Sequence, residues 1–473
     1  MAGKLSKFFG AQDMTKGHPW LNLVQFSVPL LIGNLAQQLY NTVDSIVVGQ
    51  YVGDTALAAV GASGPIFNLV LVLFIGVATG AGIMVSQYFG AKQREQLSKT
   101  VGCTLTLTLL ASLFIMIAGP LLTGPLMNLQ DTPPDIYAMA CDYLNIIFIG
   151  CAGLAFYNIV AGILRGMGDS LMPLVFLLVA CGLNIALDIL FVASFGWGVA
   201  GVAWATIIAQ AISAVLCLWR LCRMRETLDV NLHTMKLNKK LVVQLVKLGL
   251  PAGLTQAVFS AAAIVVQSLT NSFGTSVIAV STVVMRVDGF AMMPNFTFGT
   301  AMTTFAGQNV GAGRMDRVDQ GTRDGMKMGL LTSAVLVGLI LIFGEALMRM
   351  FTTTDTVIDL GVRMLRILAV GYVAMAVTQI LSGVMRGAGD TMTPMWISLV
   401  TTVLIRVPIA YAMAYFTKSA AQPAGSPDSL FVSLLVAWVL GAAITTVFYK
   451  RGAWRGKAIV HEHGAKNEPH EAA

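Results

Sequence analysis

Apolar residues occur along the chain in long blocks that are separated by short polar segments. About 20 apolar residues suffice for one α-helix to cross the hydrocarbon core of a bilayer, and each block reaches that length. We therefore predict an all-α polytopic membrane protein with twelve transmembrane helices. The predicted spans cover residues 22–48, 56–86, 101–122, 136–162, 171–194, 199–222, 245–270, 277–305, 326–348, 358–384, 392–416 and 429–449.

The composition indicates that lipid is the main solvent of this chain. Hydrophobic residues make up 56% of it and charged residues only 11%, whereas soluble proteins carry about 25% charged residues. Residues 1–20 contain no continuous apolar core. We therefore expect the first span to act as an uncleaved signal anchor rather than as a removed signal peptide.

The distribution of Lys and Arg predicts the orientation in the membrane. The net charge is +7. If the N-terminus lies inside, the loops and tails on that side contain most of the basic residues, for example Arg223, Arg225 and Lys239 in the central loop. This positive-inside pattern predicts a multi-pass protein of the plasma (inner) membrane with both termini in the cytoplasm. No basic run is interleaved with aromatic residues, so we expect no nucleic-acid partner.

The residue types that carry chemistry argue against an enzyme. The six cysteines lie in apolar blocks without a CxxC pair and are interpreted as small buried hydrophobes. An intramembrane hydrolase or transferase would need a nucleophile with a base, or a metal cluster, inside the spans, and the sequence offers neither. We expect no catalytic residue and no cofactor. The five histidines all lie in the tails or the central loop: His18, His233, His461, His463 and His470.

The two halves of the chain repeat each other at a fixed spacing. Residues 163–173 recur as residues 384–394, and residues 87–91 recur as residues 308–312, both with an offset of 221 positions. Six helices per half give both halves the same orientation, so the repeat is parallel. Two such bundles can enclose a cavity and rock about it, which favours a transporter over a receptor or an enzyme.

The repeat also predicts the domain organisation. We expect an N-terminal lobe at residues 1–222 with spans one to six, and a cytoplasmic linker at residues 223–244. A C-terminal lobe at residues 245–450 would hold spans seven to twelve, followed by a cytoplasmic tail at residues 451–473. We expect the chain to act as a monomer.

The first span carries a polar stripe. Its residues Asn34, Gln37, Gln38, Asn41 and Asp44 are spaced so that most of them share one helical face. Such a face avoids lipid and forms either a polar seam between helices or the wall of a wet cavity. We favour the cavity, because the stripe ends in a carboxylate that has no basic partner in this half of the chain.

Two further spans of the first half contain oxygen-bearing side chains. Asn184 and Asp188 are four residues apart on the fifth span and therefore share a face, and Thr206 lies a short way into the sixth span. Together with Asp44 they offer hard oxygen ligands for a small cation such as Na⁺. Alternatively, one of the carboxylates carries a proton. Asp44, Asn184, Asp188 and Thr206 are the predicted cation site.

The second half differs at the corresponding positions. Asn184 and Asp188 correspond to Ile405 and Ile409, so the ion chemistry is predicted to be confined to the first half. The eighth span carries Arg286 and Asp288, which are expected to pair with each other or with neighbours. The residues predicted to line a substrate cavity, with a helix seam as the alternative for each, are Gln37, Tyr40, Asn41, Tyr157, Asn158, Gln256, Ser260, Arg286, Asp288 and Gln379.

Two glycine-rich loops, at residues 165–169 and 386–390, share the pattern Arg-Gly-x-Gly-Asp. They resemble phosphate-binding loops only superficially, because no Lys-Ser/Thr pair follows, and we expect no nucleotide partner. They are interpreted as tight loops in which Gly permits unusual dihedral angles and Asp caps the following helix.

These motifs together resemble the multidrug and toxic compound extrusion (MATE) family over the whole chain except the tails. The resemblance implies twelve helices in two bundles, a V-shaped central cavity, and export of cationic or amphipathic compounds by antiport with Na⁺ or H⁺. In the family branch with an N-terminal-lobe cation site, the residues at the positions of Asp44, Asn184, Asp188 and Thr206 form that site. Another branch places acidic residues in the seventh and tenth spans, where this chain has none. The features that carry the resemblance are Pro29, residues 41–44, the loop at 87–91, the two Arg-Gly-x-Gly-Asp loops, and residues 184–188 and 201–206.

Two other transport functions compete with drug antiport. A flippase for lipid-linked oligosaccharides or lipids, from the same wider superfamily, would need a basic cavity for pyrophosphate. Only Arg286 and Arg406 are predicted inside the membrane, against three aspartates, which favours small-molecule drugs and organic cations as substrates. A channel would show flux that depends on no coupling gradient.

Overall fold

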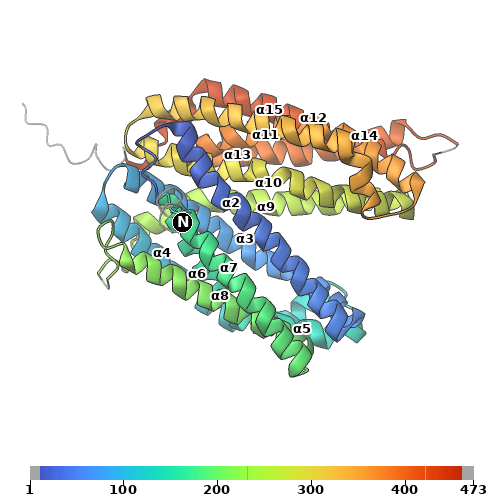
Figure 1. Ribbon diagram of the computed structural model, residues 1–473, viewed down its shortest axis with the longest axis horizontal. Coiled ribbons are helices and arrows are strands. Elements are labelled where there is room, and N and C mark those ends of the chain that lie inside the picture. Colours follow the sequence, from blue (N-terminus) through green and yellow to red (C-terminus); the bar gives the residue numbers. More distant parts are fainter. Residues whose placement is uncertain (1–10, 232, 421, 461–473) are drawn as a thin grey trace, which may run out of the picture. The chain divides into compact units, whose positions relative to one another are not determined.

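The computed structural model describes residues 11–231, 233–420 and 422–460, which fold into helices without a β-strand (Figure 1). The N-terminal residues 1–10 and the end of the predicted tail, with three of the five histidines, lie outside the described residues. The chain forms two compact units. The first, called the N-lobe, contains residues 11–14 and 24–253; the second, called the C-lobe, contains residues 15–23 and 254–460.

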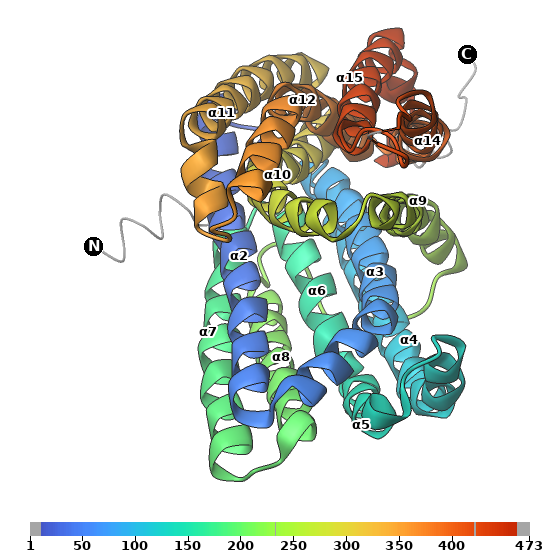
Figure 2. The same cartoon turned by 90° about the vertical axis from the view of Figure 1, so that its right-hand side faces the viewer.

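The helices of the N-lobe follow one another through short loops, and α7 and α8 pack against each other (Figure 2). They are α2 (Pro19–Val47), which belongs to this lobe from residue 24 onward, with the π-helical turn η1 (Val48–Val52), α3 (Asp54–Gly90), α4 (Arg94–Leu129), α5 (Pro134–Ile149), α6 (Cys151–Gly166), α7 (Leu171–Asp188) with the π-helical turn η2 (Ile189–Ser194), and α8 (Gly198–Arg223).

The C-lobe continues in the same manner. It contains α9 (Lys239–Ser272) from residue 254 onward, because the start of this helix belongs to the N-lobe. Its other elements are α10 (Thr275–Gly311), α11 (Met315–Arg349), α12 (Asp355–Gly387), α13 (Met392–Leu399), the π-helical η3 (Val400–Arg406), α14 (Val407–Phe416), α15 (Asp428–Arg451) and the 3₁₀ turn η4 (Ala453–Gly456).

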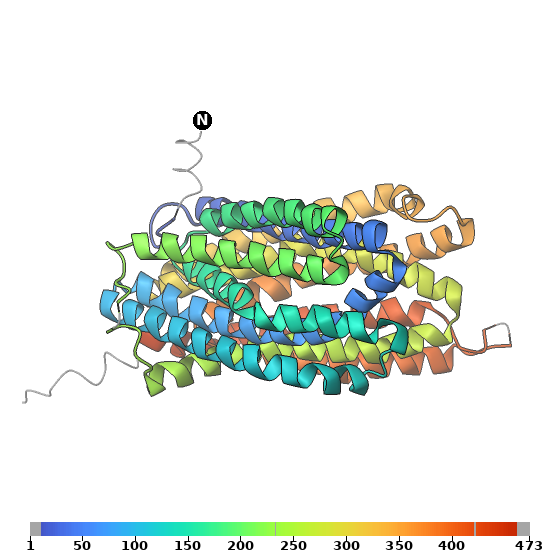
Figure 3. The same ribbon diagram turned by 90° about the horizontal axis from the view of Figure 1, so that it is seen from below.

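The described chain supplies the predicted membrane spans. Ten helical segments are long and apolar enough to cross a bilayer, and α5 with α6 adds another that bends by 51° (Figure 3). The remaining span is α2, whose polar stripe lowers its mean hydropathy. The prediction of a twelve-helix, all-α membrane protein is thereby confirmed. Large apolar side chains remain exposed on α4 and α11, for example Phe114 at 71% and Ile342 at 73%, as expected for helices that face lipid.

The internal repeat is visible in the helix bounds. Adding 221 to the bounds of α3 gives those of α10, and the pair α5 and α6 corresponds to α12 in the same way. The packing repeats too: α6 contacts α3 and α8, and α12 contacts α10 and α15. Two differences stand out. The helix α12 is continuous where α5 and α6 bend, and the loop before α15 is longer than the loop before α8.

Glycine allows the central helix of each lobe to approach its neighbour closely. A Cβ atom added to Gly162 of α6 would lie 2.9 Å from the carbonyl oxygen of Ala78 on α3. The equivalent Gly383 of α12 would collide in the same way with the carbonyl oxygen of Gly299 on α10. Lipid gives no hydrophobic drive to helix association, so this close backbone contact contributes directly to the stability of each lobe.

The two Arg-Gly-x-Gly-Asp loops adopt the predicted conformation. Gly168 and Gly389 have φ angles of +86° and +99°, which only glycine adopts readily. Asp169 Oδ1 accepts a hydrogen bond from the backbone N–H of Met172 at 3.1 Å, and Asp390 does the same for Thr393 at 3.2 Å. Both predictions for these loops, glycine dihedrals and aspartate caps, are confirmed.

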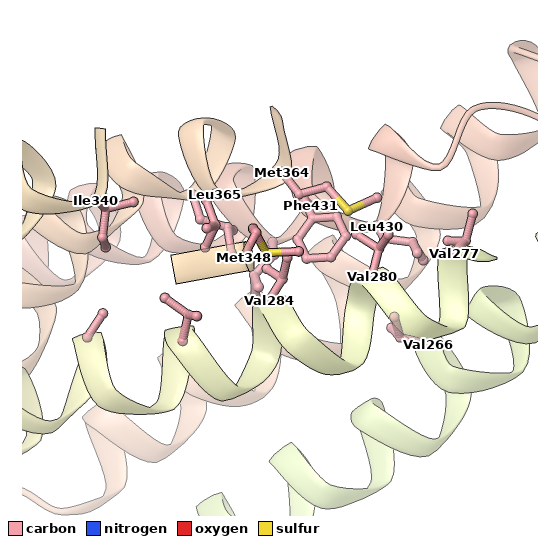
Figure 4. Close-up of a cluster of buried hydrophobic side chains, with 14 of the residues drawn as sticks. Val266, Val277, Val280, Val284, Ile340, Met348, Met364, Leu365, Leu430 and Phe431 are labelled. Atoms are coloured by element: carbon pink, nitrogen blue, oxygen red, sulfur yellow. The ribbon is translucent and has the colours of Figure 1, made fainter. Parts of the chain in front are cut away.

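A cluster of buried side chains holds the C-lobe together (Figure 4). It joins α9 and α10 to α11, α12 and α15, with Val280, Val284, Met348 and Leu365 among its most buried members. In the N-lobe a smaller cluster packs the end of α2 and the turns η1 and η2, which follow α2 and α7, against α8. That second cluster matters for function, because the candidate carboxylates lie at those helix ends.

Candidate cation site and cavity of the N-lobe

The four predicted cation-site residues come from three helices of the N-lobe. Asp44 lies near the end of α2, Asn184 and Asp188 lie on the last turns of α7, and Thr206 lies on α8. Asn184 and Asp188 are completely buried, and none of their side-chain polar atoms has a hydrogen-bond partner in the described chain. Oδ1 of Asp44 is buried without a partner as well.

Packing at the ends of α2 and α7 brings these groups together. The carboxyl groups of Asp44 and Asp188 are direct electrostatic neighbours. The phenol groups of Tyr40 and Tyr143 are close to both carboxyl groups. The hydroxyl of Tyr40 also donates to Oγ1 of Thr206 at 3.5 Å, which places α8 beside the carboxylates.

The chemistry of these groups fits a small hard cation or a proton. No basic side chain in the described ranges forms an ion pair with Asp44 or Asp188. A buried carboxylate without a counter-charge is costly in a membrane, so a positive charge must be supplied for both to stay ionised. Carboxylate, amide and hydroxyl oxygens are the ligands that suit Na⁺ rather than a transition metal. Consistent with this, no group of three His, Cys, Asp or Glu side chains with metal-binding geometry occurs among the described residues.

Next to this site the N-lobe contains a cavity of about 370 Å³. Its volume lies at the lower end of the range of about 300–1,000 Å³ that is usual for ligand sites. The cavity is lined from α2, α3 and α5 through α8, with apolar side chains such as Phe67 and Leu71 between the polar ones. Seven residues predicted for the cation site or the cavity line it: Gln37, Tyr40, Asn41, Asp44, Tyr157, Asn158 and Thr206.

Among the lining residues that were not selected from the sequence for this role are Tyr143, Gln210 and Arg165. Tyr143 gave no polar periodic signal, because it lies in an apolar block. Gln210 follows Thr206 by one helical turn, and that spacing could have indicated a shared face. Arg165 belongs to the first Arg-Gly-x-Gly-Asp motif and was assigned to a loop, but it lies in the last turn of α6 and lines the cavity.

The other predicted cavity residues belong to the C-lobe. Gln256 and Ser260 lie one turn apart on α9, where the Ser260 hydroxyl donates to the Gln256 carbonyl at 3.2 Å. Gln379 on α12 lies against Gly299 of α10. None of these residues lines the N-lobe cavity.

Asp288 and Arg286 separate on α10. Asp288 is buried, with 8% of its surface exposed, whereas Arg286 is exposed. No ion pair joins them in the described part of the chain. The electrostatic neighbours of Asp288 are instead Tyr372 on α12 and Arg406 on η3. Of the two alternatives, Asp288 associates with neighbours from other elements rather than with Arg286.

Two repeated helical lobes, one of which encloses a cavity beside partnerless carboxylates, define a membrane transporter. The MatE family model matches residues 29–190 and again residues 251–412, once in each half. The chain belongs to this family, so the predictions of a MATE transporter, of a multi-span membrane protein and of a protein that is not an enzyme are confirmed.

Known relatives match over nearly their full length. The probable multidrug resistance protein YoeA of Bacillus subtilis is 31% identical over 434 residues, which cover 90% of this chain and 94% of the relative. The probable multidrug resistance protein YpnP of the same organism is 28% identical, over 96% of this chain and 99% of the length of YpnP. A solved multidrug resistance MATE family transporter in an outward-facing conformation has the same fold, with a TM-score of 0.86 at 24% identity over 94% and 97% of the two chains.

Proposed function

We propose that this chain is a secondary active multidrug exporter that moves organic cations and amphipathic drugs out of the cell in exchange for Na⁺ or H⁺. The observation that carries the proposal is the pair of neighbouring carboxyl groups, Asp44 and Asp188, without a basic partner in the described chain. Such a pair needs an external positive charge, and a coupling ion is the simplest source of it.

The substrate class follows from the relatives and from the cavity. Both Bacillus relatives are named as probable multidrug resistance proteins. The N-lobe cavity combines apolar walls with the rings of Tyr40 and Tyr157 and with a carboxyl group at Asp44. An aromatic ring attracts a cation by about 0.5–2 kcal/mol, and the carboxylate adds to this where water is scarce.

In this mechanism the side chains of three helices act together. Asp44, Asn184, Asp188 and Thr206 would hold the ion, and a bound ion supplies the positive charge that neutralises the carboxylates. Ion binding changes the relative free energies of the transporter's conformations only if these four side chains bind the ion more tightly in one conformation than in the other. We propose that the two lobes rock between these conformations, so that ion entry and drug release are coupled.

The proposal includes the cellular setting. The basic residues on one side of the predicted membrane support a plasma (inner) membrane location with both termini in the cytoplasm. The N-lobe cavity and the four oxygen groups all belong to one chain, which supports action as a monomer.

Transport by purified protein in liposomes tests the function directly. Ethidium, an organic cation, should leave the vesicle lumen only when a sodium or a proton gradient is imposed, and wild-type protein should show this while Asp44→Asn should not. Flux that is independent of both gradients would indicate a channel. Movement of a fluorescent polyprenyl-pyrophosphate lipid, without ethidium transport, would favour the flippase.

The charge preference of the substrate has a separate test. Expression in a bacterial host that lacks its own drug exporters should protect against cationic dyes and quaternary ammonium compounds, with protein levels confirmed by immunoblotting. Protection against anionic compounds alone would show that arginines rather than aspartates determine the preference.

A further inference from the structure

The N-lobe cavity contains a second charged group, the guanidinium of Arg165. This side chain lies in the last turn of α6, is partly buried and lines the cavity. It forms no hydrogen bond or ion pair in the described part of the chain; its electrostatic neighbours are the uncharged side chains of Tyr157 and Cys217. Its five N–H donors therefore face the cavity without a partner in the described chain, and an oxyanion is the ligand that satisfies them best.

The polar groups around Arg165 are already engaged. The carboxylate of Asp169 accepts two hydrogen bonds from Arg220, at 3.1 and 3.2 Å, and one from the backbone N–H of Met172. The Tyr157 hydroxyl donates to the carbonyl of Pro173 at 3.5 Å. No acidic side chain of the described lobe therefore neutralises Arg165.

Arg165 lies at the end of the cavity that is remote from the carboxylates. The helix α7 begins after Ser170, which lines the cavity, and ends at Asp188, the neighbour of Asp44. These two positions are 18 residues apart, so about 27 Å of helix separates them. An anion bound near Arg165 would therefore experience little repulsion from Asp44 and Asp188.

Ser170 offers a second donor to an anion in this part of the cavity. It lines the cavity and precedes the first turn of α7. That turn is already capped by Asp169, whose Oδ1 accepts a hydrogen bond from the backbone N–H of Met172, so the hydroxyl of Ser170 rather than the helix end complements the guanidinium.

We propose that Arg165 and Ser170 form an oxyanion subsite in the N-lobe cavity, which binds the carboxylate of an amphipathic substrate. The inference rests on the proposed function in that it takes this cavity as a drug-binding site. It extends that function from simple cations to zwitterions, whose acidic group would bind far from the coupling ion.

The test is an equilibrium binding measurement with two dyes that differ in one group. Rhodamine 110 carries a free carboxylate, and rhodamine 123 is its methyl ester. Binding to the full-length protein in phosphatidylcholine nanodiscs is followed by fluorescence anisotropy, with no ion gradient present.

We expect Arg165→Gln to weaken rhodamine 110 binding by about tenfold, which corresponds to the loss of one charge-assisted contact. The same substitution should change rhodamine 123 binding by less than threefold. Arg165→Lys should retain part of the preference.

Arg386 of the C-lobe provides the matched control. It occupies the equivalent position of the second motif, is also partly buried, and lies in the last turn of α12. Arg386→Gln should leave the binding of both dyes unchanged. Equal weakening of both dyes by Arg165→Gln, an unchanged rhodamine 110 affinity, or no rhodamine 110 binding to the wild-type protein would overturn the subsite.

The lipid composition distinguishes a substrate carboxylate from a lipid phosphate, and the absence of a gradient distinguishes the subsite from ion-coupled export. If a lipid phosphate occupies the subsite instead, nanodiscs of phosphatidylglycerol should abolish rhodamine 110 binding to the wild-type protein, and that result would overturn the assignment to a substrate. Because the measurement uses no gradient, failure of ion-coupled export would leave the dye preference intact, so the two proposals fail separately.

Discussion

Asp44 on α2 and Asp188 at the end of α7 are electrostatic neighbours inside the N-lobe, although most of the lobe's sequence separates them. The π-helical turn η2 begins directly after Asp188, and the π-helical turn η1 begins at Val48, about one helical turn after Asp44. The cluster that contains Val48, Val192 and Val202 packs these turns against α8. The two carboxyl groups are thus held together by the packing of the helix ends rather than by a salt bridge.

The first prediction concerns these carboxylates. Asp44→Asn and Asp188→Asn should each abolish gradient-driven export while the protein still folds, because the amide keeps the shape of the side chain and removes its charge. Export is measured in liposomes and folding by size-exclusion chromatography. Asp54→Asn, at an exposed carboxylate of the same lobe, is the control and should export normally. Normal export by both site variants would refute the cation site.

The second prediction separates sodium from protons. If sodium binds to the four side chains of the predicted cation site, it should raise the melting temperature of the purified protein at constant ionic strength, and potassium should not. A concentration one hundred times the dissociation constant would add about 2.7 kcal/mol of stability. Asp188→Asn should lose this effect. Equal melting temperatures in the two salts would favour proton coupling.

The third prediction concerns orientation. In a cysteine-free background, His233→Cys places an exposed thiol in the predicted cytoplasmic linker, and Lys418→Cys places one in a loop on the opposite side. A membrane-impermeant maleimide added to intact cells should label only Lys418→Cys, because the positive-inside pattern assigns the linker to the cytoplasm. Labelling of the linker without cell lysis would mean that the orientation is reversed.

The fourth prediction compares two ion pairs of the N-lobe. The Asp169 carboxylate is fully buried and pairs with Arg220, which is 32% exposed. Arg220→Ala would leave this charge without a partner and should lower stability by about 3 kcal/mol, the lower end of the range for broken buried pairs. Lys99→Ala removes an exposed pair with Glu95, which solvent screens, and should leave the melting temperature nearly unchanged. Thermal unfolding in detergent gives both values, and equal effects would contradict the structural role of Asp169.

The fifth prediction uses two glycines that differ in their surroundings. Gly162→Ala would bring a methyl group to 2.9 Å from the backbone oxygen of Ala78, and should destabilise the protein by about 1–3 kcal/mol. Gly182 in α7 has nothing within 4 Å of the same position. Gly182→Ala should therefore stabilise the helix by up to about 0.5–1 kcal/mol. Equal or higher stability of Gly162→Ala relative to the wild-type protein would mean that α3 and α6 are not closely packed.

The sequence by itself determined the features that depend on local spacing. Twelve apolar blocks define twelve helices because the bilayer thickness sets the length of each span. The offset between the halves predicted the repeated helices, and the motif glycines predicted the loop conformations. The shared face of Asn184 and Asp188 followed from helical periodicity alone.

Only the tertiary structure decided which groups meet between helices. In lipid every face of a helix can be apolar, so hydropathy does not reveal which face packs against a neighbour. For this reason the sequence selected Asp44 and Asp188 separately but not Tyr143 beside them. It assigned Arg165 to a loop, and it left open whether Asp288 associates with Arg286 or with a neighbour. Those relationships depend on the rotation and approach of whole helices, which are set by side-chain packing and by glycine contacts far apart in the sequence.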